Sequence, residues 1–209
     1  MARTGTIAIA AAIVAVVGVG GTYLWSELRQ TTGDFAQCTR GSVAGGALGG
    51  PFTLVSETGE TVTDADVIDR PTLIYFGYTF CPDVCPLDSM RNALALEMLE
   101  ERGVDAKGVF ITVDPARDDV EVVRDFTDNF HEDMLGLTGT AEQVDAAAKA
   151  YRVYYDARIE EDPEFYLVDH SAFTYLVLPE AGFIDVFRRE AAPEEIADTV
   201  QCVAEVARV

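Results

Sequence analysis

Two cysteines separated by three residues are the strongest candidates for chemistry in this sequence. Cys81 and Cys85 lie in the run GYTFCPDVCP, between an apolar stretch and a segment with helical spacing. If helical geometry extends back over both, their Cβ atoms share one face, about 5–6 Å apart. Unpaired N–H groups at a helix N-terminus favour thiolates and lower the thiol pKa. Three uses of the pair are open: a redox dithiol, two soft ligands for copper or zinc, or a structural disulfide.

A histidine that could complete a metal site is His170, in the run VDHS just before another apolar stretch. The chain has only two histidines and four cysteines, so soft metal ligands are few. Two thiolates and one imidazole suit Cu(I) and can also hold Cu(II). Zinc would normally need a fourth ligand or an open catalytic position. The alternative role of His170 is that of a hydrogen-bonded structural residue.

The segments that must position these side chains alternate between strand and helix patterns. We predict strands at 52–55, 61–63, 71–78, 108–113, 135–137, 172–178 and 183–187, extended segments at 153–155 and 166–168, and helices at 86–102, 119–130, 141–151 and 194–206. Such an order predicts an α/β fold with a mixed sheet. In the helix after the cysteines, Leu87, Met90, Leu94 and Met98 follow helical spacing, which predicts that this stripe faces the core.

The N-terminal segment 5–25 has no charged residue, and at about 1.5 Å per residue it would span the roughly 30 Å of a bilayer core. We predict an uncleaved transmembrane anchor with residues 1–4 in the cytoplasm; a cleaved signal peptide is the alternative. A glycine-rich linker at 26–50 and one domain at 51–209 follow. On either interpretation the domain is exported to a compartment that permits disulfides.

Charge excludes one class of partner. Thirty-six acidic residues against fifteen basic ones give a net charge of −21, which repels phosphate backbones and excludes nucleic-acid binding. Arg3 is the one charged side chain of residues 1–25, so the exported part carries −22. That charge could steer the protein toward cations or a basic patch on a partner, or serve only solubility.

Two further cysteines lie outside the motif, Cys38 in the linker and Cys202 in the last predicted helix. Export permits a disulfide between them. The spacing alone does not show that their Cα atoms approach each other, so two separate thiols are the alternative.

Four separated segments occur in the order YFGYTFCPDVCP, VFITVDPARD, GLTG and VDHS. Together they closely resemble the Sco/SenC family, over roughly residues 51–205. Members of this family are membrane-tethered, thioredoxin-like copper-binding proteins that assist assembly of the dinuclear copper centre of cytochrome c oxidase. The resemblance implies a thioredoxin-like fold, with a mixed central sheet flanked by helices, preceded by one transmembrane helix.

Carried over by position, the resemblance implies that Cys81, Cys85 and His170 bind one copper ion per domain. Four more residues are expected beside the ligands or at a partner contact, with a bracing role for Asp114 and a shielding role for the tyrosine: Asp114, Asp118, Asp169 and Tyr78. The family's usual Asp-Thr-Pro-Glu is here Asp-Asp-Val-Glu at 118–121. That departure affects only where the next helix starts.

The implied function is delivery of copper to the copper-site subunit of cytochrome c oxidase, with another copper chaperone as a further candidate partner. The alternatives are a thiol–disulfide oxidoreductase that uses Cys81 and Cys85 to reduce the copper-ligand cysteines of that subunit, and a redox or copper sensor. Against the reductase, the motif is CxxxC rather than CxxC, and Ser171-Ala172-Phe173 replaces the proline of thioredoxin-like reductases. The expected location is the inner (cytoplasmic) membrane, with the domain on the outer, periplasmic side.

Overall fold

The computed structural model describes residues 34–39, 48–159 and 165–207. The chain divides into two units, Met1–Gln37 and Cys38–Val209. In the first unit, the described part is the short helix η1 (Asp34–Gln37). The predicted anchor at 5–25 lies outside the described residues. Within those residues, no helix combines the length and the apolar character that a membrane crossing requires.

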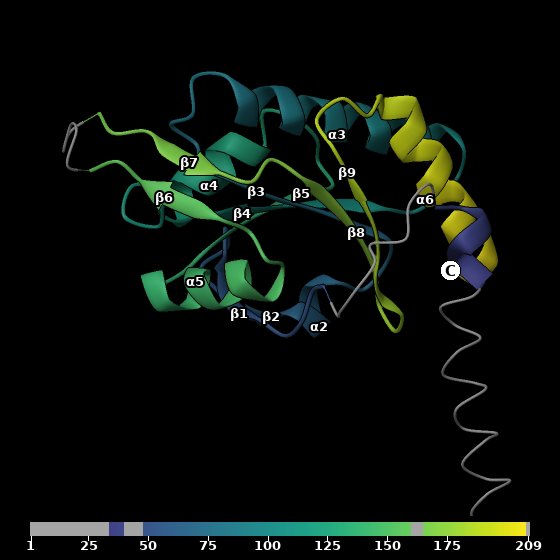
Figure 1. Cartoon of the computed structure of the whole chain (residues 1–209), viewed down its shortest axis with the longest axis horizontal. Coiled ribbons are helices and arrows are strands. Elements are labelled where there is room, and N and C mark those ends of the chain that lie inside the picture. The colour runs from purple at the N-terminus through teal and green to yellow at the C-terminus, as the bar shows by residue number, and fades with distance from the viewer. Residues whose placement is uncertain (1–33, 40–47, 160–164, 208–209) are drawn as a thin grey trace, which may run out of the picture. The chain divides into compact units, whose positions relative to one another are not determined.

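A seven-stranded mixed sheet forms the centre of the second unit (Figure 1). Its strand order is β2-β1-β5-β4-β3-β8-β9, with these bounds: β1 (Thr53–Ser56), β2 (Thr61–Thr63), β3 (Thr72–Gly77), β4 (Lys107–Thr112), β5 (Met134–Thr138), β8 (Thr174–Leu178) and β9 (Gly182–Phe187). The central strands β3, β4 and β5 are parallel, and the outer pairings are antiparallel. Every residue of β3 is buried, as expected for a strand covered on both faces. The predicted mixed sheet is confirmed.

Helices cover both faces of this sheet. Their bounds are α2 (Asp64–Val67), α3 (Val84–Glu101), α4 (Val120–Thr127), α5 (Ala141–Ala150) and α6 (Pro193–Ala207). Figure 1 shows α3 and α6 along one side and α5 along the other. Adjacent residues of β3 follow this division. The hydroxyl of Tyr75 donates to Asp88 of α3 at 3.1 Å, whereas the ring of Phe76 lies 5.4 Å from that of Tyr151, at the end of α5.

The sequence at 118–121 differs from the family's usual one and left the start of the next helix, α4, open. A capping aspartate sets that start. Asp119 is the N-cap, and its carboxylate accepts the backbone N–H groups of Glu121 and Val122, each at 3.0 Å. These bonds satisfy two of the donors that a helix N-terminus leaves unpaired. The helix therefore begins at Val120.

The apolar stripe of α3 does not face the core, contrary to the prediction. Leu87, Met90 and Leu94 are 60%, 46% and 37% exposed, and Met98 is only half-buried. The helix therefore presents a row of apolar side chains on its outer face.

Polar residues share the inner face of α3 with Ala95, Leu96 and Leu99, and several of them pair with one another. Asp88 pairs with Arg91 at 3.1 Å. Arg91 also donates to the hydroxyl of Thr174 on β8 at 2.9 Å, and that hydroxyl donates to Asn92 at 3.0 Å. Buried polar groups are tolerated when they are paired in this way. Helical spacing of apolar residues therefore identified the helix but the wrong face.

A second, two-stranded sheet consists of β6 (Tyr155–Ala157) and β7 (Val168–His170), each two residues later than the predicted extended segments. The two strands are antiparallel, and His170 is the register partner of Tyr155. This ribbon fixes the backbone at the predicted histidine ligand.

A disulfide joins Cys38 to Cys202 of α6, with Cα atoms 5.6 Å apart. The cysteines are 164 residues apart in the sequence. The bond holds the chain at Cys38 against the last helix. Cys81 and Cys85 are free thiols.

Candidate metal centre

The two free cysteines lie between the end of β3 and the first turn of α3. Cys81 is in the loop and Cys85 is the second residue of the helix, and both are buried. The backbone N–H of Cys85 donates to Cys81 Sγ at 3.4 Å. The unpaired N–H groups of the helix N-terminus thus point at a sulfur atom, as the spacing predicts.

Glycine is required immediately before this loop. A Cβ atom at Gly77 would lie 3.0 Å from Cys85 Sγ and 2.9 Å from Cε1 of Tyr75. The ring of Phe110 on β4 would be equally close, at 3.0 Å. A side chain at residue 77 would therefore have to displace the thiol or the neighbouring rings.

His170 reaches the same point from β7. Its Nε2 lies 3.3 Å from Cys85 Sγ, and its Nδ1 lies 3.2 Å from the carbonyl oxygen of Ser171. The ring can donate to that carbonyl from Nδ1 or to a thiolate from Nε2, and a metal ion bound through the Nε2 lone pair would require the first tautomer. The rings of Tyr75 and Tyr78 stand edge-on to the imidazole, with centroids 6.2 and 5.8 Å away.

The two thiols share one proton. A hydrogen bond from the Cys85 thiol lowers the pKa of Cys81 to about 3, and further bonds from His170 and backbone N–H groups act in the same direction against the effect of burial. The same bond, together with burial, raises the pKa of Cys85. The structure therefore presents a thiolate, a thiol and an imidazole, and a metal that binds both sulfurs must displace the shared proton.

Tyr78 shields this cluster as an uncharged side chain. It is buried, and burial raises its pKa to about 12, with the neighbouring Cys81 thiolate acting in the same direction. A neutral phenol beside the thiolate keeps out water without adding a second negative charge.

Asp118 fixes the loop between β3 and Cys81 through hydrogen bonds. Its carboxylate accepts the backbone N–H of Thr79 at 2.9 Å and the hydroxyls of Thr79 and Thr112, each at 2.6 Å. Burial raises the pKa of Asp118, although these bonds oppose the shift. The side chain is fully buried, so it positions the loop between Gly77 and Cys81 and offers no surface to a partner.

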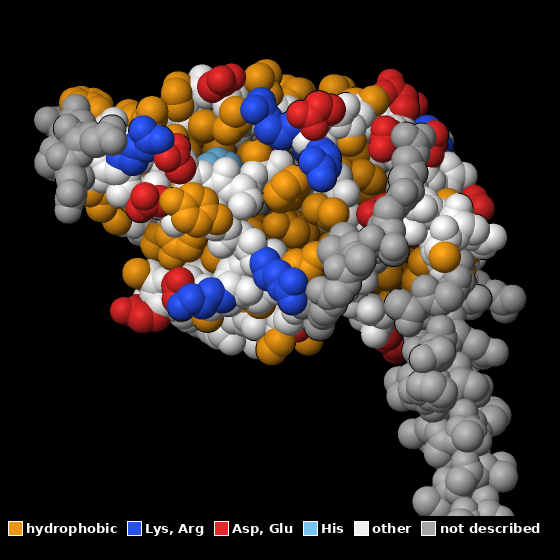
Figure 2. Space-filling model, in the orientation of Figure 1, with side chains coloured by type: hydrophobic (Ala, Val, Ile, Leu, Met, Phe, Trp, Pro, Cys, Tyr) orange, Lys and Arg blue, Asp and Glu red, His pale blue; other side chains and the backbone are white. Residues whose placement is uncertain are grey.

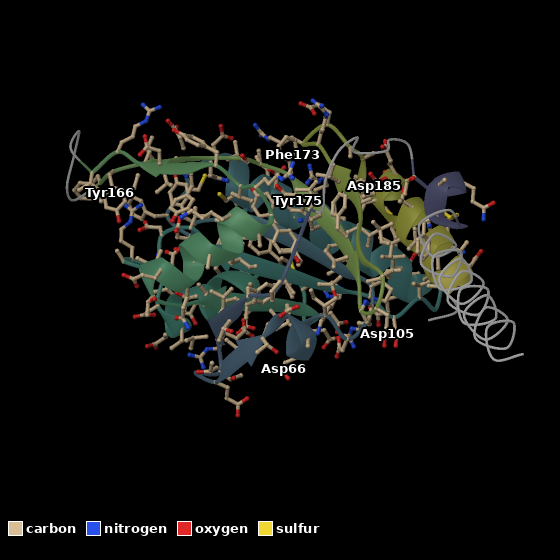
Figure 3. All side chains as sticks on the ribbon, turned by 60° about the horizontal axis from the view of Figure 1, so that its bottom comes forward. Asp66, Asp105, Tyr166, Phe173, Tyr175 and Asp185 are labelled. Carbon is tan, nitrogen blue, oxygen red and sulfur yellow. A yellow bond between two sulfur atoms is a disulfide. The ribbon has the colours of Figure 1, made fainter. Side chains whose placement is uncertain are left out.

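Asp114 holds a layer of aromatic and cationic groups beside the loop. It is buried, and its carboxylate accepts the hydroxyl of Tyr166 at 2.7 Å and Nε of Arg117 at 2.5 Å. The guanidinium of Arg117 lies over the ring of Tyr166, 3.6 Å from its centroid, and 4.9 Å from the centroid of Phe80. Tyr166 comes from the segment before β7 (Figure 3). The carboxylate of Asp114 thus reaches the cysteine loop only indirectly, through Arg117 and the ring of Phe80.

Asp169 lies apart from the cluster. Its exposed carboxylate pairs with Arg158, which donates from Nε at 2.9 Å. The site also includes residues that the sequence did not single out, namely Tyr75, Gly77, Asp88, Arg117 and Tyr166. For Tyr75 a signal existed, because strand alternation places it on the same face as Gly77, beside the thiols.

Among residues 34–39, 48–159 and 165–207, no group of three or more His, Cys, Asp or Glu side chains is arranged to hold a metal ion as it stands. The pairwise contacts nevertheless put the three soft donors together. For metal bonds of about 2.0 Å to nitrogen and about 2.3 Å to sulfur, donor atoms on one ion lie about 3–4 Å apart. The 3.3 Å between Cys85 Sγ and His170 Nε2 is in that range. The spacing of these donors therefore fits the binding of one metal ion.

Comparison with known proteins agrees with this geometry. The family model described as SCO1/SenC matches residues 41–205. Protein SenC of Rhodobacter capsulatus is 53% identical over 201 residues, which cover 96% of this chain and 90% of that protein. The chain spans about half the length of mitochondrial SCO1 homologues from Arabidopsis thaliana and Homo sapiens.

Two similar solved structures hold copper. Arabidopsis thaliana ScoI with copper bound has a TM-score of 0.69 and 38% identity, over 78% of this chain and 100% of that one. Yeast Sco1 with copper bound has the same TM-score and identity, over 75% of this chain and 87% of that one. With its thioredoxin-like α/β fold, its motif order and these similarities, the chain belongs to the SCO1/SenC family.

Proposed function

We propose that this protein is a copper chaperone that binds one copper ion through Cys81, Cys85 and His170 and passes it to the copper-site subunit of cytochrome c oxidase. The observation that carries the proposal is the contact of the Cys85 sulfur with His170 Nε2 beside the Cys81 thiolate. Copper-bound relatives with 38% identity support the choice of metal.

The surroundings of the three donor residues suit a copper ion that must be bound and then released. Two thiolates and an imidazole bind either oxidation state of copper with soft donors. Asp118 and Gly77 fix the loop between the sulfur atoms and the sheet, so the donors are positioned before the ion arrives. Only three protein donors are supplied, which leaves room for a ligand from a partner to enter before one of them leaves.

The proposed setting follows from the N-terminal sequence. Residues 5–25 anchor the protein in the inner membrane and place the domain on the outer, periplasmic side, where the oxidase copper site is assembled. A second copper chaperone is the proposed source of the ion.

The low pKa of Cys81 favours one second candidate function, the reduction of a disulfide in the partner's copper site. The Cys81 thiolate would attack one partner sulfur and release the other as a thiolate. Cys85 would then displace the partner, leaving a Cys81–Cys85 disulfide and a reduced partner dithiol. An external dithiol reductant would have to regenerate the protein.

Anaerobic titration of the soluble domain with Cu(I) and with Cu(II) tests the chaperone proposal. We expect one copper per domain and, with Cu(II), a thiolate-to-copper charge-transfer band. His170→Ala should lose both, and His131→Ala is the matched control because His131 lies after α4 and accepts the N–H of Asp133. Full copper affinity in His170→Ala would contradict the proposed donor set.

A copper-free assay tests the second candidate function, reduction of a disulfide in the partner's copper site. The reduced domain is mixed with an oxidised copper-site domain of the oxidase, and free thiols on the latter are counted. Reduction that depends on both Cys81 and Cys85, together with failure to transfer copper, would favour the reductase.

A further inference from the structure

A buried carboxylate on α3 is connected to the metal centre through one tyrosine. Asp88 follows Cys85 by three residues and is 3% exposed. Most acidic side chains in the described part of the chain are exposed or half-buried, and Figure 2 shows several of them beside Lys or Arg side chains on one face. A carboxylate that is removed from water must be supplied with partners inside the protein. The partners of Asp88 include groups next to the proposed copper ligands.

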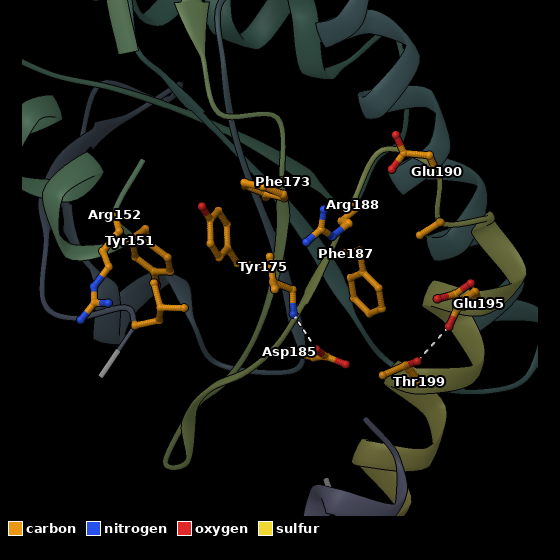
Figure 4. Close-up of a pocket in the computed structure, with 13 residues that line it drawn as sticks. Tyr151, Arg152, Phe173, Tyr175, Asp185, Phe187, Arg188, Glu190, Glu195 and Thr199 are labelled. Atoms are coloured by element: carbon orange, nitrogen blue, oxygen red, sulfur yellow. Dashed lines mark hydrogen bonds between the residues drawn. The ribbon is translucent and has the colours of Figure 1, made fainter. Parts of the chain in front are cut away.

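Two guanidinium groups hold this carboxylate in place. Arg91, which is itself buried, pairs with Oδ1 of Asp88 at 3.1 Å, and Nε of Arg189 lies 3.6 Å from Oδ2. Burial raises the pKa of Asp88, and the charges of both arginines oppose that shift. Arg91 also donates to the backbone carbonyl oxygens of Arg188 and Arg189 at 3.2 and 2.9 Å. Figure 4 shows Arg188 and Glu190 on the segment that leads from β9 to α6, so contacts between α3 and that segment fix the carboxylate.

The hydroxyl proton of Tyr75 has two acceptors. The hydroxyl donates to Oδ2 of Asp88 at 3.1 Å. It also forms a side-chain hydrogen bond with Cys85: the bond to Cys81 and burial raise the pKa of Cys85, and the bond from Tyr75 opposes them. A phenol has one proton to donate, so a strong bond to one acceptor weakens the bond to the other. The carboxylate and the sulfur therefore compete for this proton.

Packing places the ring of Tyr75 against the sulfur and away from water. A Cβ atom at Gly77 would lie 2.9 Å from Cε1 of Tyr75 and 3.0 Å from Cys85 Sγ, so the ring edge and the sulfur are neighbours. The same ring stands edge-on to His170, with centroids 6.2 Å apart. Tyr75 is 1% exposed, so bulk water does not replace either acceptor.

Copper binding changes the balance between the two acceptors. In the metal-free site Cys85 keeps the proton that it shares with Cys81, which makes the Asp88 carboxylate the stronger acceptor. When copper binds both sulfurs that proton is displaced, and the Cys85 thiolate becomes a second acceptor for Tyr75. A hydrogen bond to a coordinating sulfur withdraws charge from it, and such bonds tune the potential of copper–thiolate sites. Donation from Tyr75 would therefore weaken the bond of Cys85 to Cu(II) more than its bond to Cu(I).

We propose that Asp88 is a positioning residue of the copper site, which holds the hydroxyl proton of Tyr75 away from the Cys85 sulfur. Cys85 then binds copper as a strong thiolate donor, and the site retains Cu(II) better than it would with a hydrogen-bonded sulfur. Asp88 acts through Tyr75 and is not itself a ligand. The inference rests on the proposed function, because it concerns how one of the three proposed ligands donates to copper.

The test compares the full chain in four forms: wild type, Asp88→Asn, Tyr75→Phe and the double variant. Each is titrated with Cu(I) and Cu(II) against competing chelators, and the thiolate-to-Cu(II) band is recorded. In Asp88→Asn the hydroxyl turns to Cys85, so the band should move to higher energy. The ratio of Cu(I) to Cu(II) affinity should rise about 3- to 10-fold, and tenfold corresponds to about 59 mV for a one-electron couple. Tyr75→Phe should keep the wild-type band and ratio.

The double variant separates the effect of the hydroxyl proton from the effect of charge. Loss of a buried negative charge near copper would by itself favour Cu(I), and that effect does not need the hydroxyl of Tyr75. We expect Asp88→Asn to shift the band and the ratio far less when Tyr75→Phe is also present. Glu97→Gln, at an exposed position of α3, is the matched control and should behave as the wild type does.

Asp88→Asn also leaves the guanidinium of Arg91 without its carboxylate, and a buried unpaired charge destabilises a fold. If that variant does not fold, Asp88→Asn/Arg91→Gln removes both charges, and the same shifts are expected from it. Circular dichroism and a stoichiometry of one copper per chain check each variant.

Three results would overturn this inference alone, provided that one copper is bound. The first is a wild-type band and affinity ratio in the folded Asp88 variant. The second is an equal shift with and without the Tyr75 hydroxyl, since Asp88 would then act by charge only. The third is a shift in Tyr75→Phe alone, which would mean that the hydroxyl already bonds to Cys85. If Cys85→Ser keeps full copper affinity, the proposed function fails and this inference fails with it.

Discussion

The four cysteines form two pairs that differ in spacing, in bonding and in surroundings. Cys81 and Cys85 are four residues apart, buried and unbonded, and contact His170. Cys38 and Cys202 are 164 residues apart and joined by a disulfide. The first pair lies at a helix N-terminus, where N–H groups and an imidazole stabilise a thiolate. The second pair lies away from the His170 cluster and closes a long stretch of chain.

The difference shows that surroundings, more than residue type, determine what a cysteine does. In the first pair the neighbouring groups keep sulfur available as a ligand. In the second pair the fold itself brings two distant residues to a bonding separation. Each pair should therefore be removable without loss of the other's role, and the predictions below test that independence.

The largest expected effect is on copper. Cys85→Ser should weaken copper binding by more than about 100-fold, since losing a ligand costs more than losing a group that orients one. The double variant Cys38→Ser/Cys202→Ser is the matched control and should bind one copper with wild-type affinity. Titration with Cu(I) against a competing chelator measures both. Weak binding in the double variant would show that the two pairs are not independent.

The next effect is on stability. Loss of the Cys38–Cys202 bond should lower the free energy of unfolding by about 2–5 kcal/mol, because the bond closes a long loop in the unfolded chain. Urea unfolding of the double serine variant, followed by circular dichroism, measures the change. Cys85→Ser should change it far less. A double variant as stable as the wild type would show that the Cys38–Cys202 bond does not stabilise the fold.

A smaller effect is expected from the glycine that makes room for Cys85. Gly77→Ala should cost about 1–3 kcal/mol, because its Cβ would lie within 3.0 Å of Cys85 Sγ and two rings. Copper binding should also weaken as the sulfur is displaced. Gly50→Ala is the control, since its Cβ would meet only Ala150 at an ordinary 3.5 Å. Equal melting temperatures and copper affinities for the two variants would contradict the packing argument.

The last prediction concerns the protonation of Cys81 and is read as absorbance rather than as stability. The pKa of Cys81 is lowered to about 3, whereas an unfolded cysteine titrates near about 8.5. A lowered folded pKa stabilises the fold fully above the unfolded value, and the contribution is lost as pH falls through the folded value. Thiolate ultraviolet absorbance should therefore persist in the metal-free domain at pH 5 and disappear near pH 3. Cys81→Ser should lack this acidic step. Titration of the wild type near its ordinary value would contradict the shared proton.

Much of the fold and the soft donors of the site could be predicted from the sequence, because both depend on local pattern. The apolar run ending at Gly77 predicts a buried central strand, and β3 is one. Residue type and spacing alone made Cys81, Cys85 and His170 candidates, and the family resemblance implied them as ligands. The helix bounds were less exact, since the helices predicted at 86–102 and 119–130 are Val84–Glu101 and Val120–Thr127.

The rest depends on contacts between distant segments, which spacing does not reveal. Asp118 bonds to Thr79 across 39 residues, and Arg91 bonds to Thr174 across 83. The second of these networks turned the polar face of α3 inward and left Leu87 outside. A hydrophobic pattern reflects the transfer free energy of each residue taken singly. It therefore does not reveal hydrogen bonds and ion pairs between buried polar residues, which offset the cost of burying them.

The Cys38–Cys202 disulfide also determines where a mechanical load would enter the domain. A pull on the chain before Cys38 would pass at that residue into a covalent bond with α6. Without that bond the same pull would act first on the hydrogen bond between Gly49 and Ala150 and then on β1, so the contacts would break one after another. With it, a pull applied before Cys38 reaches α6 first, so the sheet that positions the thiols is loaded through that helix and not from its edge.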